Sequence, residues 1–177
     1  AFHGGPPSAV GAGAGLVPED RKRQGLALVR SVQDNLLVAG LRALFPNRWY
    51  RPARAAVAAG ELIATLRVST PSPRRLVKFL SGGNQQKVVI GKWLNAGSRL
   101  FIFDEPTRGI DVGAKAEIYN LMETLVAGGA AVLMISSELP EIVAVCDRAY
   151  VIRQGKVVYN GSAQALLDDA RLLGERS

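Results

Sequence analysis

Residues 100–105 read Leu100-Phe101-Ile102-Phe103-Asp104-Glu105, four apolar residues followed directly by two acids. A short apolar run with two aromatic rings predicts a strand that is buried on both faces. Carboxylates at the end of such a strand are costly to bury unless a cation compensates them, and ligands of open α/β sheets bind at that edge. The first acid suits a Mg²⁺ ion shared with phosphates, and the second suits a base or a group that positions an attacking water.

Strand and helix patterns alternate around this stretch. We expect helices over 84–95, 114–127 and 140–145, and a second buried strand over 130–135. Residues 149–159 predict a hairpin that turns at Gln154-Gly155, and 163–173 predict an amphipathic helix. Upstream, the apolar pair Leu16-Val17 before Pro18 is typical of a strand that feeds a loop. Strands that alternate with helices indicate a parallel, layered α/β core.

Residues 31–80 have a different character, because prolines divide much of the segment into short helices and loops. Ser31, with Asp34 three residues later, predicts the start of a helix. A further helix is expected over 53–66. We therefore expect a mostly helical insert with its basic residues on the outside.

The segment Ser81-Gly82-Gly83 stands immediately before the helix expected over 84–95. Two glycines let a backbone approach an anion closely, and the start of a helix directs amides and its positive dipole end at that anion. Ser81 adds a hydroxyl donor. Taken alone, such a segment is equally typical of a flexible loop.

The net charge of +7 is unevenly placed along the chain. Residues 1–80 carry 12 Lys or Arg and 4 Asp or Glu, a net +8, whereas residues 81–177 carry 10 and 11, a net −1. A basic half is typical of contact with nucleic acid or an anionic membrane, or simply of a solvated surface. No dense basic run with interleaved aromatics is present, which disfavours nucleic acid.

Composition sets further bounds. Hydrophobic residues at 48% and charged residues at 21% exclude general disorder. The single cysteine, Cys146, permits no internal disulfide, and we expect it to be a small buried hydrophobe. No apolar run approaches the roughly 20 residues that a membrane span needs, so we expect a soluble intracellular chain.

Three motifs in order resemble ATP-binding cassette (ABC) ATPase domains. Residues 80–86 are similar to the ABC signature, 101–105 to the Walker B motif with its catalytic glutamate, and 106–111 to the connection to the D-loop. Residues 79–87, 104–115 and 136–141 together resemble the second cassette of tandem-cassette ATPases that drive bacterial uptake of ribose, galactose and xylose. The resemblance extends over about residues 7–162.

This resemblance implies an α/β, P-loop NTPase-like cassette core with an inserted helical subdomain. Residues 1–30 would be a remnant of the core with the Q-loop region, 31–80 the helical subdomain, and 81–177 the rest of the core. In such proteins each ATP lies between the Walker A loop of one cassette and the signature of another. The implied cofactors are ATP and Mg²⁺, with Asp104 holding the metal and Glu105 as the catalytic residue. The implied nucleotide-binding residues are Ser81, Gly82, Gly83, Gln85, Asp111, Glu19 and Ser137.

The sequence departs from the family pattern at three places. No Gly-x-x-x-x-Gly-Lys-Ser/Thr motif occurs, so we expect the Walker A loop to lie upstream of Ala1. Glu19 stands where most cassettes have the Q-loop glutamine, and Ser137 where most have the switch histidine. The one histidine, His3, is far from that position, and a hydroxyl carries no imidazolium charge near neutral pH. We expect a weak Glu105 site, a signature that serves the other site, and no ATP hydrolysis by the chain alone.

The implied partners are a second cassette, a transmembrane permease and, indirectly, a sugar-binding protein, with no nucleic acid. The implied location is the cytoplasmic face of the bacterial inner membrane. An alternative is a ribosome-associated or DNA-repair ABC ATPase, which the basic charge favours. The Asn84-Gln85-Gln86-Lys87 tail of the signature and the Ser136-Ser137-Glu138 segment disfavour it.

Overall fold

The computed structural model describes residues 5–167, and the chain divides into two compact units, 1–135 and 136–177. The division falls directly after the third strand of the main sheet. Each unit is described by itself below. His3 and part of the helix expected over 163–173 lie outside the described residues.

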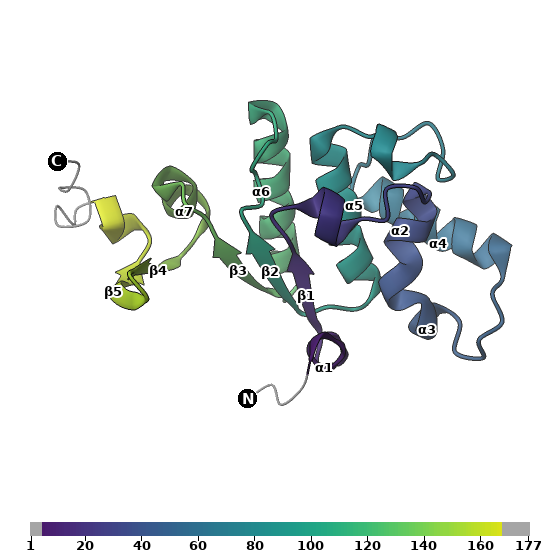
Figure 1. Cartoon of the computed structure of the whole chain (residues 1–177), viewed down its shortest axis with the longest axis horizontal. Helices are drawn as coiled ribbons and strands as arrows, with labels where there is room; N and C mark the ends of the chain where they lie inside the picture. The colour runs from purple at the N-terminus through teal and green to yellow at the C-terminus, as the bar shows by residue number, and fades with distance from the viewer. Residues whose placement is uncertain (1–4, 168–177) are drawn as a thin grey trace. The chain divides into compact units, whose positions relative to one another are not determined.

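The first unit is built on a parallel sheet of three strands, β1 (Ala14–Val17), β2 (Leu100–Asp104) and β3 (Ala131–Ile135). β2 lies between the other two, so the apolar run of residues 100–103 occupies the centre of the sheet (Figure 1). The register places Leu16, Ile102 and Leu133 in one cross-strand row. The parallel α/β core expected from the sequence is confirmed.

Helices α5 (Gly82–Asn95) and α6 (Val112–Ala127) pack beside this sheet, and each begins two residues earlier than the sequence predicted. A short helix, α1 (Pro6–Gly11), precedes β1. The side chains of Phe101 and Phe103 are fully buried and stack with ring centroids 6.4 Å apart. Ile118 and Met122 of α6 are buried as well, so the core lies on the helical side of the sheet.

The other face of the sheet corrects an expectation, because β2 and β3 are not buried on both faces. The exposed fractions of Leu16, Leu133 and Ile135 are 47%, 51% and 49%. Burial therefore alternates along β2 instead of being continuous. The sequence pattern reports the preference of apolar side chains for burial, whereas actual burial requires a layer on each face.

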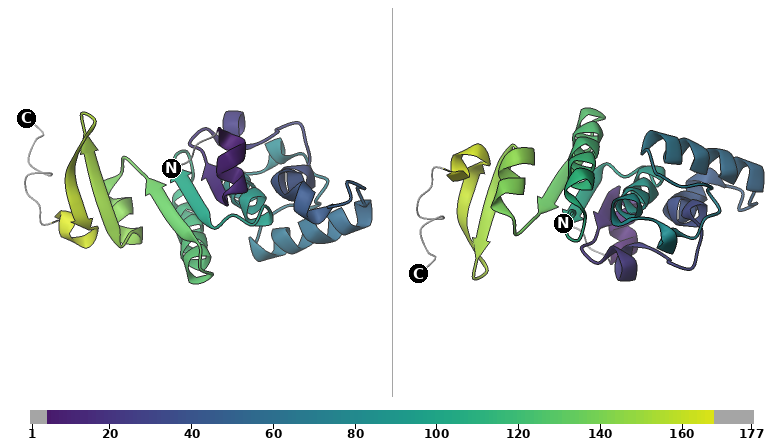
Figure 2. Two further views of the ribbon diagram at one scale, coloured as in Figure 1. Left: turned by 90° about the horizontal axis from the view of Figure 1, so that it is seen from below. Right: turned by 90° about the horizontal axis from the view of Figure 1, so that it is seen from above.

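The helical insert consists of α2 (Val32–Leu37), α3 (Leu41–Leu44) and α4 (Pro52–Thr65), joined by short 3₁₀ turns and loops. Ser31 caps α2 in a reciprocal capping box with Asp34, as expected. A cluster that includes Val32, Leu36 and Val88 packs the insert against α5, and α2 and α4 lie beside α5 in both views of Figure 2. The insert is therefore anchored on the helix that begins with the glycine motif.

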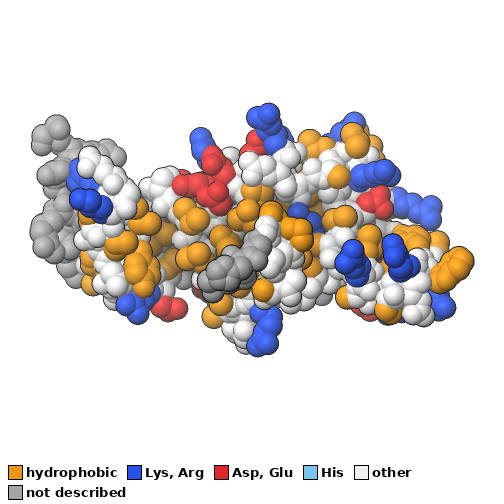
Figure 3. Space-filling model, turned by 60° about the horizontal axis from the view of Figure 1, so that its bottom comes forward, with side chains coloured by type: hydrophobic (Ala, Val, Ile, Leu, Met, Phe, Trp, Pro, Cys, Tyr) orange, Lys and Arg blue, Asp and Glu red, His pale blue; other side chains and the backbone are white. Residues whose placement is uncertain are grey.

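The basic side chains of the insert lie on its surface, as the sequence predicted. All eight Lys and Arg residues of 31–80 are exposed, and Figure 3 shows such side chains among patches of hydrophobic ones. Large apolar groups are exposed here too, since Trp49 is 80% and Val57 62% exposed. No helix of the described residues is both long and apolar enough to cross a membrane.

The second unit contains α7 (Leu139–Val145) and the hairpin of β4 (Arg148–Arg153) and β5 (Lys156–Ser162). The hairpin turns at Gln154-Gly155, as expected, and both residues have positive φ. Of the helix expected over 163–173, the described part is a 3₁₀ helix, Gln164–Leu167. Cys146 is half-buried against Ala149 and Leu166. Burial raises the pKa of its thiol and Asp147 adds to the shift, which disfavours the reactive thiolate.

Candidate functional site

The start of α5 presents the glycine motif at the surface. Ser81 is the N-cap of this helix and is exposed, and its Oγ accepts hydrogen bonds from the backbone N (3.4 Å) and side-chain Nδ2 (2.9 Å) of Asn84. The Oδ1 of Asn84 in turn accepts from the backbone N of Ser69 at 2.7 Å. Asn84 thus ties the first turn of α5 to the helical insert.

Gly82 and Gly83 are required by close packing against the segment that follows β2. A Cβ on Gly83 would lie 2.8 Å from the Cβ of Ala114, and a Cβ on Gly82 would lie 3.3 Å from the carbonyl oxygen of Gly109. The sequence expectation for these glycines was close approach to an anion. The structure adds that they let two motifs more than twenty positions apart touch one another.

The acid pair lies where the sequence placed it, at the carboxyl end of β2. Asp104 is the last residue of the strand, and both acids are half-buried. Glu105 has φ +45, in the left-handed region that non-glycine residues rarely adopt. Its backbone N donates to the carbonyl oxygen of Ile135 at 2.9 Å. Held strain of this kind concentrates at functional sites.

Asp111 is the N-cap of α6 and its Oδ1 accepts from the backbone N of Ala114 at 3.0 Å. The residue is exposed, and Val112 beside it is 85% exposed. The same two residues, Asp111 and Ala114, therefore connect the glycine motif, the loop after β2 and the start of α6.

The loop after β1 contacts the loop after β2. Glu19 forms an ion pair with Arg108 in the loop after β2. Arg21 begins a short π-helical turn (Arg21–Gly25) and its Nη1 donates to the carbonyl oxygen of Arg108 at 3.2 Å. Glu19 was expected at the nucleotide, and the structure shows it held by a cation of its own chain.

Gln85, which the resemblance placed among the nucleotide-binding residues, is buried. Its side chain is only 2% exposed, and its Nε2 donates to the carbonyl oxygens of Val77 (3.3 Å) and Leu80 (3.2 Å). In this structure Gln85 braces the turn that leads into α5. The expectation of ligand contact rested on its place in the motif, whereas helical geometry turns this position inward.

Ser137 belongs to the second unit and is exposed. Its neighbour Ser136 closes the turn before α7, because its Oγ accepts from the backbone N of Glu138 at 3.0 Å and donates to Oε2 of Glu141 at 3.2 Å. The placement of Ser137 at the Glu105 site stays a prediction.

Asp104 fits a Mg²⁺ ion that takes most of its ligands from elsewhere. Among the described residues no group of three or more His, Cys, Asp or Glu side chains gathers to hold a metal. Mg²⁺ at phosphate sites is bound by one or two carboxylates together with waters and phosphates. A single carboxylate at the end of β2 matches that pattern.

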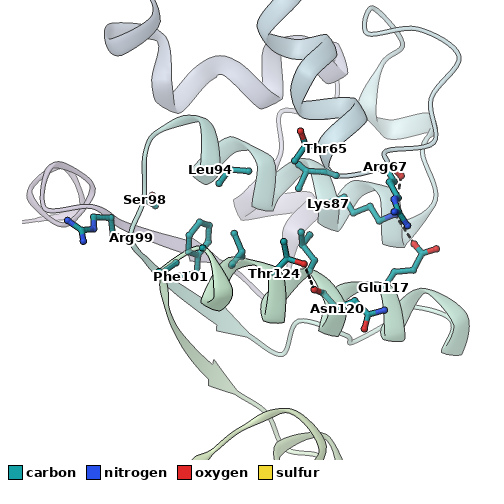
Figure 4. A pocket seen from close by; sticks show the side chains of 16 residues that line it. Thr65, Arg67, Lys87, Leu94, Ser98, Arg99, Phe101, Glu117, Asn120 and Thr124 are labelled. Atoms are coloured by element: carbon teal, nitrogen blue, oxygen red, sulfur yellow. Dashed lines mark hydrogen bonds and ion pairs between the residues drawn. The ribbon is translucent and has the colours of Figure 1, made fainter.

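A pocket of the first unit lies away from these residues. It measures about 810 Å³ and lies between the end of α4, α5 and α6 (Figure 4). Lys87 at its wall is engaged by Glu117 at 2.7 Å and by the carbonyl oxygen of Arg67 at 3.1 Å. Ser98 and Arg99 place the pocket at the amino end of β2, opposite to where α/β sheets bind their ligands.

Sequence reasoning assigned no role to Arg21 or Arg108. Both lie in segments that resemble the family, and Arg21 is one of three basic residues in a row within 21–23. Only its burial, at 9% exposed, distinguishes it from the exposed Lys22 and Arg23. No sequence signal identifies which of the three turns inward.

Comparison with solved structures identifies the class of protein that has this fold. The chain superposes on an ATP-binding cassette of an ABC transporter, MJ1267 in its ADP conformation, with a TM-score of 0.75 and 23% identity, covering 95% of this chain and 69% of that chain. A nucleotide-free ATP-binding cassette from an ABC transporter gives 0.76 at 22% identity, covering 96% and 70%. The fold is therefore that of an ABC transporter ATP-binding cassette. No protein-family model matches the chain.

Similarity in sequence to curated proteins shows which ABC transporter ATP-binding proteins this chain is related to. The ribose import ATP-binding protein RbsA 1 of Burkholderia thailandensis is 53% identical over 162 residues, 90% of this chain and 32% of that protein. The arabinose import ATP-binding protein AraG of Rhizobium etli is 48% identical over 156 residues, 88% of this chain and 31% of that protein. The chain is homologous to these sugar-import ATP-binding proteins, and it spans about a third of the length of the curated relatives it matches.

Proposed function

We propose that this chain is part of the ATPase subunit of an ABC importer, which couples ATP binding and hydrolysis at a cassette dimer interface to uptake of a monosaccharide or similar small molecule. The observation that carries the proposal is the contact between the start of α5 and the loop after β2. It joins Ser81 and Gly82 at the start of α5 to the segment that carries Asp111, which follows Asp104 at the end of β2. The homology to ribose and arabinose import proteins supports the transport assignment.

The start of α5 would hold the γ-phosphate of ATP bound by another cassette. Its N-terminal dipole favours an anion, and the Ser81 hydroxyl, which accepts from Asn84, keeps its proton free to donate. Asp111 on the exposed rim would bridge the two sites of the dimer.

At the chain's own site, Asp104 would hold Mg²⁺ and Glu105 would polarise the attacking water. When bound, Mg²⁺ neutralises charge that develops on the phosphates. The fixed backbone of Glu105, at φ +45 and bonded to Ile135, keeps its carboxylate at the end of β2. Glu19 is drawn to Arg108, and Ser137 offers a hydroxyl instead of an imidazole. We infer that this half supports hydrolysis at the other site more than it hydrolyses ATP itself.

The partners would be a second cassette, a transmembrane permease and, through the permease, a sugar-binding protein, at the cytoplasmic face of the bacterial inner membrane. The exposed aromatic and basic side chains of the insert, including Trp49 at 80% and Tyr50 at 52% exposed, offer the permease a surface that is both apolar and cationic. Such a mixture is typical of protein interfaces.

Steady-state ATPase and transport assays on the complete ATPase that carries this chain test the proposal. Ser81→Arg places a bulky cation at the start of α5 and should nearly abolish turnover, whereas Ala127→Arg, an exposed change at the far end of α6, should not. Glu105→Gln should cost less than Ser81→Arg, because a base contributes about 10²–10⁴-fold only where the rest of its site works. Equal damage by both would refute the supporting role of this half, and full activity of Ser81→Arg would refute the proposed function.

A further inference from the structure

The guanidinium of Arg21 lies against Gly82, the first residue of helix α5. A Cβ on Gly82 would lie 2.7 Å from Nη2 of Arg21, and Nη1 of the same guanidinium donates to the carbonyl oxygen of Arg108 at 3.2 Å. The side chain is 9% exposed. One buried cation therefore touches both segments of the candidate site, and a larger residue at position 82 would have to displace its guanidinium.

The guanidinium is poorly compensated within the described residues. Arg21 makes no ion pair there, its Nε has no hydrogen-bond partner, and the carboxylate of Glu19 is taken by Arg108. The Oδ1 of Asp20 accepts from the backbone N of Arg23. Burial lowers the pKa of Arg21 from its usual value, with Asp20 opposing part of the shift. Arginine stays protonated nonetheless, so the position holds an unpaired buried charge, which is costly.

The position is unfavourable for a second reason. Cations are stabilised at the C-terminal end of a helix and disfavoured at the N-terminal end, where the dipole is positive. Arg21 lies at the N-terminal end of the 14-residue helix α5. An anion bound in front of the helix would reduce the cost of the unpaired buried charge. It would also reduce the repulsion between the guanidinium and the helix dipole, because the anion faces both.

We propose that Arg21 is a positioning residue for nucleotide turnover: it holds Gly82 and the loop after β2 in register, and adds a fixed positive charge behind the start of α5 for the phosphate bound there. The inference rests on the proposed function of the α5 start. Arg21 acts through Gly82 and the backbone of Arg108 and does not itself touch the nucleotide.

The test compares three variants of the complete ATPase. Arg21→Met removes the charge and keeps the length, Arg21→Lys keeps the charge, and Arg23→Met removes the same charge from an exposed position of the same turn. Loss of a hydrogen-bond donor that touches the transition state lowers kcat by about 10²–10³-fold. Loss of a residue that acts through another group should lower kcat by less. We expect Arg21→Met to lower kcat by roughly ten-fold at nearly unchanged Tm, Arg21→Lys to recover most of the loss, and Arg23→Met to match the parent.

Two results would overturn the inference. In the first, Arg21→Met keeps kcat within about two-fold of the parent while Ser81→Arg is inactive. In the second, both Arg21 variants lose Tm and activity together without rescue by lysine, which is the mark of a purely structural role. If Ser81→Arg also retains full turnover, the proposed function itself has failed, and the two failures are thereby distinguished.

Discussion

Glu19 is ion-paired with Arg108, which joins the loop after β1 to the loop after β2 across 89 positions of sequence. The two side chains are 41% and 69% exposed. Exposed pairs contribute about 0–1 kcal/mol because water and salt screen them. The pair therefore serves to direct the two loops more than to stabilise the chain.

A double-mutant cycle on this pair should show weak coupling. We expect Glu19→Gln and Arg108→Met each to change the free energy of unfolding by less than about 1 kcal/mol, with a coupling energy near 0.5 kcal/mol that falls in high salt. Urea denaturation of the two single variants and the double variant measures it. A coupling above about 2 kcal/mol would show that the pair is instead a stabilising element.

The isolated chain should bind ATP weakly and hydrolyse none. The phosphate-gripping Gly-x-x-x-x-Gly-Lys-Ser/Thr loop is absent from its sequence, and the start of α5 offers only one side of a site. We expect a dissociation constant above roughly 1 mM, measured by titration calorimetry with Mg²⁺-ATP. Micromolar binding, or turnover that Glu105→Gln removes, would contradict this expectation.

Two glycine-to-alanine substitutions in the insert should act in opposite directions. A Cβ on Gly40 would overlap the side-chain amide and the main-chain carbonyl of Asn95, whereas a Cβ on Gly60 of α4 meets nothing within 4 Å. We expect Gly40→Ala to lower the free energy of unfolding by about 1–3 kcal/mol and Gly60→Ala to raise it by about 0.5–1 kcal/mol. Urea melts of both variants measure the difference, and a stabilised Gly40→Ala would show that the insert moves away from α5 at little cost.

The left-handed backbone of Glu105 predicts a reversal of the usual ranking of alanine and glycine. At φ +45 a Cβ costs about 1–2 kcal/mol, which exceeds the flexibility penalty of glycine. We expect Glu105→Gly to be more stable than Glu105→Ala by about 0.5–1 kcal/mol. At Ala116, an exposed position inside α6, glycine should be less stable than alanine by about 1 kcal/mol.

Glu105→Gly and Glu105→Ala both lose the carboxylate. The difference between their free energies of unfolding therefore reports the cost of a Cβ in this backbone conformation. Thermal or urea unfolding of the four proteins gives the result. If alanine is the more stable residue at both positions, Glu105 is not strained in solution.

Several elements were predictable because their signals are local. The strand at 100–104, the Ser31–Asp34 capping box and the turn at Gln154-Gly155 each depend on a few adjacent residues, and each was confirmed. The burial of β3 was not predictable, because it depends on what covers the strand. The roles of Arg21 and Gln85 depend on contacts with distant segments, which a single sequence does not encode locally.

The row of Leu16, Ile102 and Leu133 has a practical consequence for anyone who produces this chain alone. Within the described residues, β3 is an edge strand of the sheet, and its outer face carries Leu133 and Ile135, each about half exposed. An exposed edge with apolar side chains is a template for pairing with another copy. Refolding yields should therefore fall steeply with protein concentration, and a lysine at position 133 is the change that should restore a dispersed monomer.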